Sequence, residues 1–128
     1  MAHTAVFARA TVFGSIEKHN IVDDWVIHAM SFVDTSMWQQ YRIAIDTGNG
    51  MAGAILPKIL PQLPLDVEEL YFELDGTFPN HEANPLKSET LTDLKRVVVQ
   101  EGCIAGVAFD GDADRVGFVD EHGKQLSG

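Results

Sequence analysis

The sequence has little cysteine, few positive charges and no long apolar run. Its only cysteine, Cys103, excludes an internal disulfide and fits a reducing compartment, so we expect a cytoplasmic protein. Nine Lys and Arg stand against 19 Asp and Glu, and the net charge of −10 argues against nucleic acid or an anionic membrane as the main partner. No apolar stretch is long enough to span a bilayer, and no signal peptide is evident.

The chain does contain enough apolar residues for one domain. With 128 residues and 45% hydrophobic content, it can form a core of ordinary size. Residues 14–128 are predicted to form a single α/β domain. Residues 1–13 are hard to place: Val6–Ala8 and Thr11–Phe13 could form a short strand, or the segment could be foreign to the domain.

Apolar periodicity and capping residues predict three helices. The first runs from about Asn20 to Val33, and the second follows Gly53, where Pro57 should kink or shorten it. The third runs from Ser88, as the N-cap, to Glu101, and Gly102 ends it. The apolar stripe of the first helix, which we expect to pack in the core, consists of Val22, Trp25, Val26, Ala29, Met30 and Val33.

Four strands are predicted, at Arg42–Ile45, Glu69–Leu74, Ile104–Phe109 and Val116–Val119. Helices join the first three strands, which should therefore be parallel, whereas the tight loop before the last strand makes it antiparallel. The predicted fold class is α/β: a three-layer sandwich in which a mixed, mostly parallel four-stranded sheet has helices on both faces.

A group of acidic residues follows the third predicted strand. Asp110, Asp112 and Asp114 alternate along a loop, so their side chains point the same way and repel one another unless a cation sits among them. Carboxylate oxygens suit Mg²⁺ or Ca²⁺, not zinc or copper. A solvated acidic turn is the plainer interpretation, but the flanking strands favour a metal. Ligands of such sheets bind beyond the carboxyl ends of the strands, where Asp46 and Asp75 also lie.

Other interpretations of the motifs are possible. Gly48, Gly50 and Gly53 match the G-x-G-x-x-G dinucleotide fingerprint between a strand and a helix, with Asp75 as a candidate ribose ligand, although a tight turn explains the glycines as well. A nucleotide- or metal-binding module therefore stays open. So does a Mg²⁺-dependent phosphatase-like enzyme, because Glu73–Thr77 resembles the D-x-D-G-T signature of haloacid-dehalogenase-type phosphatases, with Glu73 in place of the nucleophilic Asp.

An EF-hand is a weaker match to the same acidic loop. Asp110, Asp112, Asp114 and Glu121 occupy four positions of a calcium-binding loop, but Arg115 stands where glycine is required, and the flanks are predicted strands.

The acidic loop, Asp110–Arg115, resembles the metal-binding loop of the α-D-phosphohexomutases, the phosphomannomutase/phosphoglucomutase superfamily. Asp46–Gly50 resembles that family's first strand-end loop, and Asp75–Pro85 resembles its Phe-Pro-Asn-His segment. The resemblance covers roughly residues 14–128 and identifies the chain with the second of four domains. Ala113 stands where the family often has Gly, a mild departure that should not disturb the carboxylates.

The resemblance implies a function for the parent enzyme. Asp110, Asp112 and Asp114 would bind Mg²⁺ together with a phosphoserine from the first domain, and Arg115 would steady the transferring phosphoryl group or neutralise the acidic cluster. The enzyme would interconvert hexose 1-phosphate and 6-phosphate. Partners would be the hexose phosphate and the other three domains. Because the serine, sugar-binding and phosphate-binding loops are absent, the isolated chain is expected to be inactive. His81 is expected to brace its loop.

Overall fold

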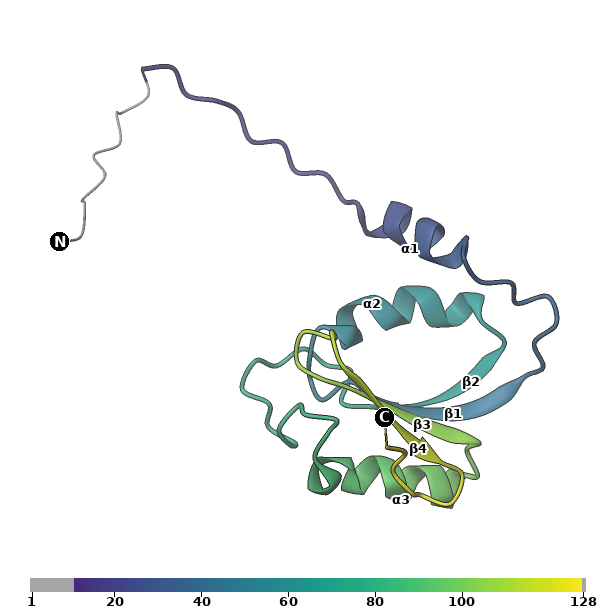
Figure 1. Ribbon diagram of the computed structural model, residues 1–128. Coiled ribbons are helices and arrows are strands. Elements are labelled where there is room, and N and C mark those ends of the chain that lie inside the picture. The colour runs from purple at the N-terminus through teal and green to yellow at the C-terminus, as the bar shows by residue number, and fades with distance from the viewer. Residues whose placement is uncertain (1–10, 128) are drawn as a thin grey trace.

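The computed structural model describes residues 11–127, which form one sheet with helices on both sides (Figure 1). The 3₁₀ helices are η1 (Leu60–Gln62) and η2 (Ser88–Leu91). The α-helices are α1 (Val22–Met30), α2 (Ala52–Ile59) and α3 (Thr92–Glu101). The strands are β1 (Tyr41–Asp46), β2 (Leu65–Leu70), β3 (Ala105–Phe109) and β4 (Val116–Asp120).

The sheet has the strand order β2-β1-β3-β4. Strand β1 pairs in parallel with both β2 and β3, and β3 pairs antiparallel with β4. Helices α1 and α2 lie on one side of the sheet and α3 lies on the other (Figure 1). These features confirm the predicted three-layer sandwich with a mixed, mostly parallel four-stranded sheet.

The main core lies between the sheet and α3. Each strand contributes one buried side chain to this face. Gly106 lets α3 approach closely, since a Cβ there would lie 2.7 Å from Val98 Cγ2. Cys103 is buried in this core, and burial raises the pKa of its thiol. The other buried members are Ala44, Leu70, Leu91, Leu94, Val98, Ala108 and Val119.

The second strand differs from the prediction. We expected it at Glu69–Leu74, but β2 spans Leu65–Leu70. The apolar alternation continues beyond Leu70, yet Tyr71 adopts a left-handed conformation with φ of +59°, which ends the strand. The real strand is acidic because it lies at the sheet edge, where Glu68 pairs with Arg42 of β1.

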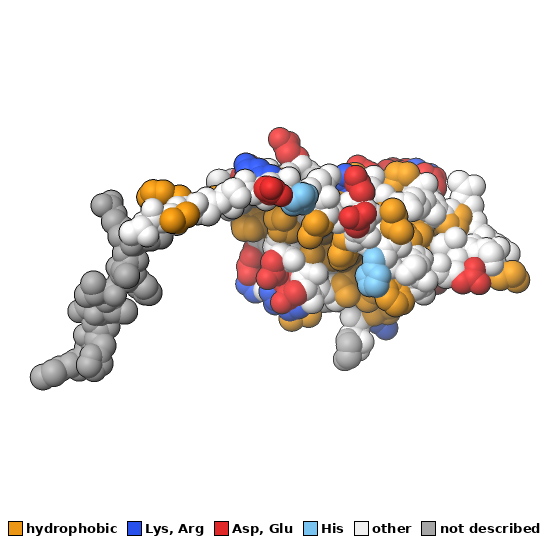
Figure 2. All heavy atoms as spheres, turned by 90° about the horizontal axis from the view of Figure 1, so that it is seen from above, with side chains coloured by type: hydrophobic (Ala, Val, Ile, Leu, Met, Phe, Trp, Pro, Cys, Tyr) orange, Lys and Arg blue, Asp and Glu red, His pale blue; other side chains and the backbone are white. Residues whose placement is uncertain are grey.

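The first predicted helix is present, but it is shorter than predicted and its expected core packing is wrong. Helix α1 ends at Met30, before Val33, and of its apolar stripe only Val26 is buried, while Trp25 remains 48% exposed. The reason is that α1 lies over α2 instead of against the sheet (Figure 1). Figure 2, which views the molecule from above, shows apolar side chains exposed among charged ones.

Other local predictions have mixed outcomes. Gly102 ends α3 in a left-handed conformation, as predicted. Ser88 does not cap a helix: it is the first residue of η2, and its hydroxyl accepts a hydrogen bond from Lys95. Pro57 lies inside α2, which ends soon after it. Thr11–Phe13 forms no strand, and Val6–Ala8 lies outside the described residues.

Within residues 11–127, no helix combines the length and apolarity required to cross a membrane.

Gly53 offers a test of how α2 packs. A Cβ at this position would lie 2.2 Å from the carbonyl oxygen of Phe72, so backbone must move to admit it. Helix propensity favours alanine over glycine by about 1 kcal/mol, but this clash should dominate. We expect Gly53→Ala to lower the free energy of unfolding by roughly 1–3 kcal/mol in urea denaturation.

Gly76→Ala is the matched control, because a Cβ at Gly76 meets nothing within 4 Å. Equal stability of the two alanine variants would contradict the packing of α2 against Phe72.

Candidate metal centre

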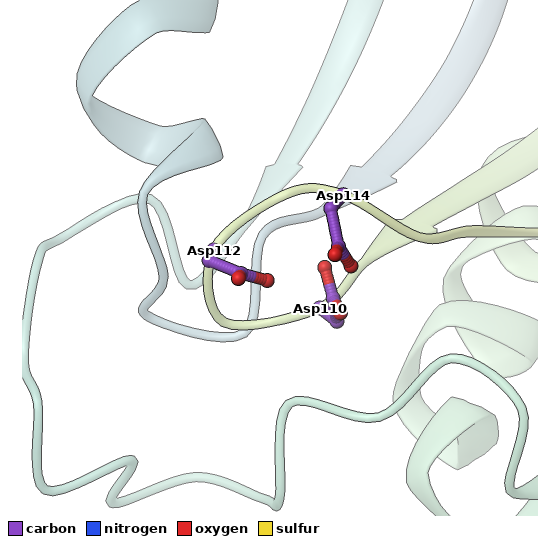
Figure 3. A group of neighbouring side chains, drawn as sticks. All are labelled: Asp110, Asp112 and Asp114. Atoms are coloured by element: carbon purple, nitrogen blue, oxygen red, sulfur yellow. The ribbon is translucent and has the colours of Figure 1, made fainter.

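The acidic loop connects β3 to β4 at the edge of the sheet where β1 and β3 end (Figure 3). Its ends are closed by a backbone hydrogen bond from Asp110 N to Arg115 O, 3.2 Å long, which continues the β3–β4 ladder. A second bond, from Ala113 N to Asp110 O, folds the loop into a turn. Ala113 has a φ of +64°, a conformation that L-residues other than Asn and Asp rarely adopt. The loop is therefore a defined turn.

The structure brings the three predicted metal ligands together. One carboxylate oxygen from each of Asp110, Asp112 and Asp114 lies within 4.8 Å of the others, and the side chains converge (Figure 3). Asp110 is buried, whereas Asp112 and Asp114 are exposed. No other group of three acidic, His or Cys side chains among the described residues has this proximity.

Arg115 holds the buried member of the cluster in place. Its Nε donates to Asp110 Oδ2 at 2.6 Å, and its backbone N donates to Asp110 Oδ1 at 3.1 Å. Burial opposes ionisation of Asp110, but these two bonds, together with a hydrogen bond to Asp114 and the charge of Arg115, hold the pKa of the carboxyl below its usual range. Arg115 Nε also lies 3.5 Å from Asp114 Oδ1. The salt bridge expected as one role of Arg115 is therefore present.

The cluster carries more negative charge than Arg115 offsets. A hydrogen bond with Asp110, followed by the charges of Asp112 and Asp110, raises the pKa of the Asp114 carboxyl. Mutual repulsion of this kind is relieved by a proton or by a metal cation. A donor set made only of carboxylate oxygens fits Mg²⁺ or Ca²⁺.

The glycine-rich segment after β1 has a packing role. Gly48 has a φ of +52°, a Cβ at Gly50 would lie 2.8 Å from Gly111 O, and Gly53 packs on Phe72. The backbone of the acidic loop thus occupies the space above Gly50 into which a dinucleotide pyrophosphate would fit. The structure favours the tight-turn interpretation over the dinucleotide fingerprint.

Neither of the other predicted strand-end acids joins the cluster. Asp46 is the last residue of β1, but it is buried and bonded to His81. Asp75 lies beyond the end of β2 at Leu70, which corrects its predicted place, and its Oδ1 accepts hydrogen bonds from Thr77 N and Oγ1. These hydrogen bonds lower the pKa of Asp75 and make it a turn residue, so the geometry gives no support to a phosphatase nucleophile here.

The EF-hand interpretation is also unsupported. Glu121 lies in the turn after β4 and is not among the clustered carboxylates, and both flanks of the acidic loop are strands.

Sequence reasoning missed a polar network beneath the loops. His81 Nε2 lies 2.9 Å from Asp46 Oδ2, the His81 ring packs edge-on against Tyr71, and the Tyr71 hydroxyl donates to Asp93 Oδ2 at 2.7 Å. Burial raises the pKa of Asp46, while His81 and the Gly48 N–H oppose this rise. The bond to Asp46 agrees with the bracing role expected of His81. No sequence signal links these partners, which are far apart along the chain.

The fold and loop together define a class: an α/β/α domain that presents a carboxylate cluster at the carboxyl edge of its sheet. A family model described as phosphoglucomutase/phosphomannomutase, alpha/beta/alpha domain II, matches residues 23–123. Because this match covers most of the chain, the chain belongs to that family as its second domain.

Individual relatives agree. The chain is 42% identical over 110 residues to the phosphomannomutase/phosphoglucomutase of Pseudomonas syringae pv. tomato. This match covers 86% of the chain and 23% of the relative. It is 38% identical over 117 residues to the phosphoglucomutase of Neisseria meningitidis serogroup B, and this match covers 91% of the chain and 25% of the relative. A crystal structure of a family protein from Burkholderia thailandensis matches with a TM-score of 0.79 and 30% identity, over 86% of this chain and 24% of that one. The chain thus spans about a quarter of the length of these relatives.

The Tyr71–Asp93 bond predicts a dependence on alkaline pH. The hydrogen bond to Asp93, and then burial, raise the pKa of Tyr71 from 10.0 to about 12. Because the folded state holds this proton more tightly, the bond stabilises the fold fully below pH 10 and loses its contribution as the pH rises towards 12.

We expect the ultraviolet titration of tyrosinate, measured as wild type minus Tyr71→Phe, to have its midpoint near pH 12. In Asp93→Asn the midpoint should move down towards the ordinary tyrosine value. A wild-type midpoint already at that ordinary value would contradict the bond.

Proposed function

We propose that this chain is the Mg²⁺-binding domain of a phosphohexomutase that interconverts hexose 1-phosphate and 6-phosphate. The observation that supports the proposal is the convergence of Asp110, Asp112 and Asp114 in a family-typical loop, with their oxygens within 4.8 Å. Relatives named phosphomannomutase/phosphoglucomutase and phosphoglucomutase support the choice of substrate class.

In this proposal each side chain has a distinct task. The exposed carboxylates of Asp112 and Asp114 and the buried carboxylate of Asp110 hold the ion. A bound Mg²⁺ withdraws charge from a phosphoryl group and favours in-line transfer. Asp110 is also the anchor of Arg115, whose side chain is 51% exposed and can therefore contact a phosphoryl oxygen while it keeps its bond to Asp110.

The rest of the reaction belongs to parts that this chain does not supply. By the family resemblance, the phosphoserine and the loops that bind sugar and phosphate come from the other three domains. The net charge of −10 agrees with this division, because dianionic sugar phosphates need positive charge that this domain largely lacks. We therefore propose that the isolated chain is not a competent mutase.

The metal assignment predicts a localised response to Mg²⁺. Without the phosphoserine oxygen we expect weak binding, with a dissociation constant on the order of millimolar, as for sites with few protein ligands. In an amide chemical-shift titration, the shifts should be confined to residues 109–116 and should be lost in Asp112→Asn.

Glu121→Gln is the matched control, because it removes one exposed carboxylate outside the cluster. It should leave the Mg²⁺ titration unchanged, whereas loss of binding would favour an EF-hand. Shifts centred on Asp75 would favour the phosphatase-like alternative.

The proposed division of labour predicts an inactive domain. Incubated with Mg²⁺ and either glucose 1-phosphate or mannose 1-phosphate, the chain should form no 6-phosphate above the protein-free rate, because the phosphoryl donor is absent. A full-length relative assayed in parallel serves as the positive control. Product formation that disappears in Asp112→Asn would contradict the proposal.

A further inference from the structure

The acidic loop rests directly on the segment Thr47–Met51, which follows β1. Met51 N donates to Gly111 O at 2.9 Å. At Gly50 the two backbones are so close that a Cβ would lie 2.8 Å from Gly111 O and 3.1 Å from Asp110 O. No side chain separates the two segments there, so a shift of Thr47–Met51 passes directly to the backbone that carries Asp110.

Asn49 fixes this supporting segment from beneath. It is 6% exposed and has a φ of +60°. Its side-chain Nδ2 donates to Glu73 O at 2.8 Å, and its Oδ1 accepts from Asn80 Nδ2 at 2.8 Å. Its backbone N donates to Tyr71 O, and its backbone O accepts from Asp75 N. One side chain thereby ties the segment to the long loop at residues 71–85.

His81 attaches the same long loop to the end of β1. Its Nε2 lies 2.9 Å from Asp46 Oδ2, and its Nδ1 lies 2.8 Å from Glu82 O. Asp46 Oδ1 in turn accepts from Gly48 N at 2.8 Å, at the start of the supporting segment. Since the Asp46 side chain is 1% exposed, water cannot replace a lost partner, and an unpaired buried carboxylate is costly.

The long loop also contacts the acidic loop itself. A Cβ built on Gly111 would lie 3.3 Å from Phe78 Cζ, so the Phe78 ring covers the Gly111 backbone. Gly111 is therefore held from two sides, by Met51 and by Phe78, and both supports depend on how residues 71–85 are attached.

We propose that Asn49 and His81 are positioning residues for the metal site: they hold Thr47–Met51 in place, and with it the Asp110–Gly111 backbone that sets the spacing of the three carboxylates. This inference rests on the proposed Mg²⁺ site. Neither residue touches the cluster, and both act through the backbone contacts described above. Groups that orient metal ligands typically change metal affinity by 10–100-fold when they are removed.

The test compares Mg²⁺ affinities of variants that remain folded. Asn49→Gly removes the amide but permits the positive φ, and His81→Asn moves the side-chain donor away from Asp46. Both should weaken Mg²⁺ binding by roughly tenfold in the amide titration, while the amide shifts of β1–β4 stay unchanged. Asn80→Ala, which removes an exposed partner of Asn49, should give a smaller loss and covers the case in which a buried variant fails to fold.

Two further variants separate a role in positioning the metal site from a role that only braces the loop at residues 71–85. In His81→Gln the amide nitrogen replaces Nε2 as a donor to Asp46, so affinity should return to within about twofold of wild type. His122→Asn, at an exposed histidine in the turn after β4, should have no effect. Unchanged Mg²⁺ affinity in Asn49→Gly and His81→Asn, despite altered shifts in residues 71–85, would overturn the proposal and leave only a bracing role.

A metal-free readout distinguishes failure of this inference from failure of the proposed function. The Arg115 Nε proton, bonded to Asp110 Oδ2, should resonate downfield in wild type. If wild type binds no Mg²⁺, the proposed function fails, and the inference is judged on this proton. Loss of its downfield shift in His81→Asn and recovery in His81→Gln support positioning, whereas an unchanged shift overturns it.

Discussion

The site depends on one contact, the backbone packing of the Thr47–Met51 segment against the start of the acidic loop. A loop that carries three carboxylates has little apolar surface with which to hold its shape, so contacts from neighbouring segments support it. Gly50 allows the support to come within van der Waals distance of Gly111 O, and the Met51 N–H then bonds that oxygen. Because β1 and β3 are parallel neighbours, their carboxyl ends meet at one edge of the sheet, and this is what brings the two loops together.

Electrostatics is the reason for which we propose a further cation at the cluster beside Arg115. Asp110 is buried and remains ionised because Arg115 donates two hydrogen bonds to it. That single guanidinium cannot offset three carboxylates. The pKa of Asp114 is raised first by its hydrogen bond with Asp110 and then by the negative charges of Asp112 and Asp110. In the proposed site, a divalent ion would relieve this repulsion, and that relief would contribute to the free energy of metal binding. Under the proposed function, a chain of net charge −10 would rely on other domains for the positive charge that binds phosphate.

Much of the fold could be predicted from the sequence, and the two clear errors have the same cause. The buried strands β1 and β3 and the third helix carry patterns that a core imposes, and their predicted positions agree with the structure within a residue or so at most ends. Strand β2 lies at the sheet edge and is acidic because its Glu68 pairs with Arg42, a contact that no local pattern reveals. Helix α1 has an apolar stripe typical of core packing, yet it lies over α2 and buries only Val26. In both cases a neighbour distant in sequence, not the local pattern, decides the environment.

The sequence by itself determined the order of elements, the position of the acidic loop between two strands, and the supply of carboxylate oxygens there, because these follow from local periodicity and side-chain chemistry. Only the tertiary structure decided which acids act together. Asp46, Asp75 and Asp110 were all predicted to lie at the ends of strands. In the structure, however, Asp46 is hydrogen-bonded to His81, and Asp75 accepts a hydrogen bond from Thr77 in a turn. Likewise, the roles of Asn49, Gly50 and His81 arise from contacts with residues 73–80, 110–111 and 46, respectively. Such contacts depend on how the strands pair and how the loops pack above them, and neither is written in the spacing of residues along the chain.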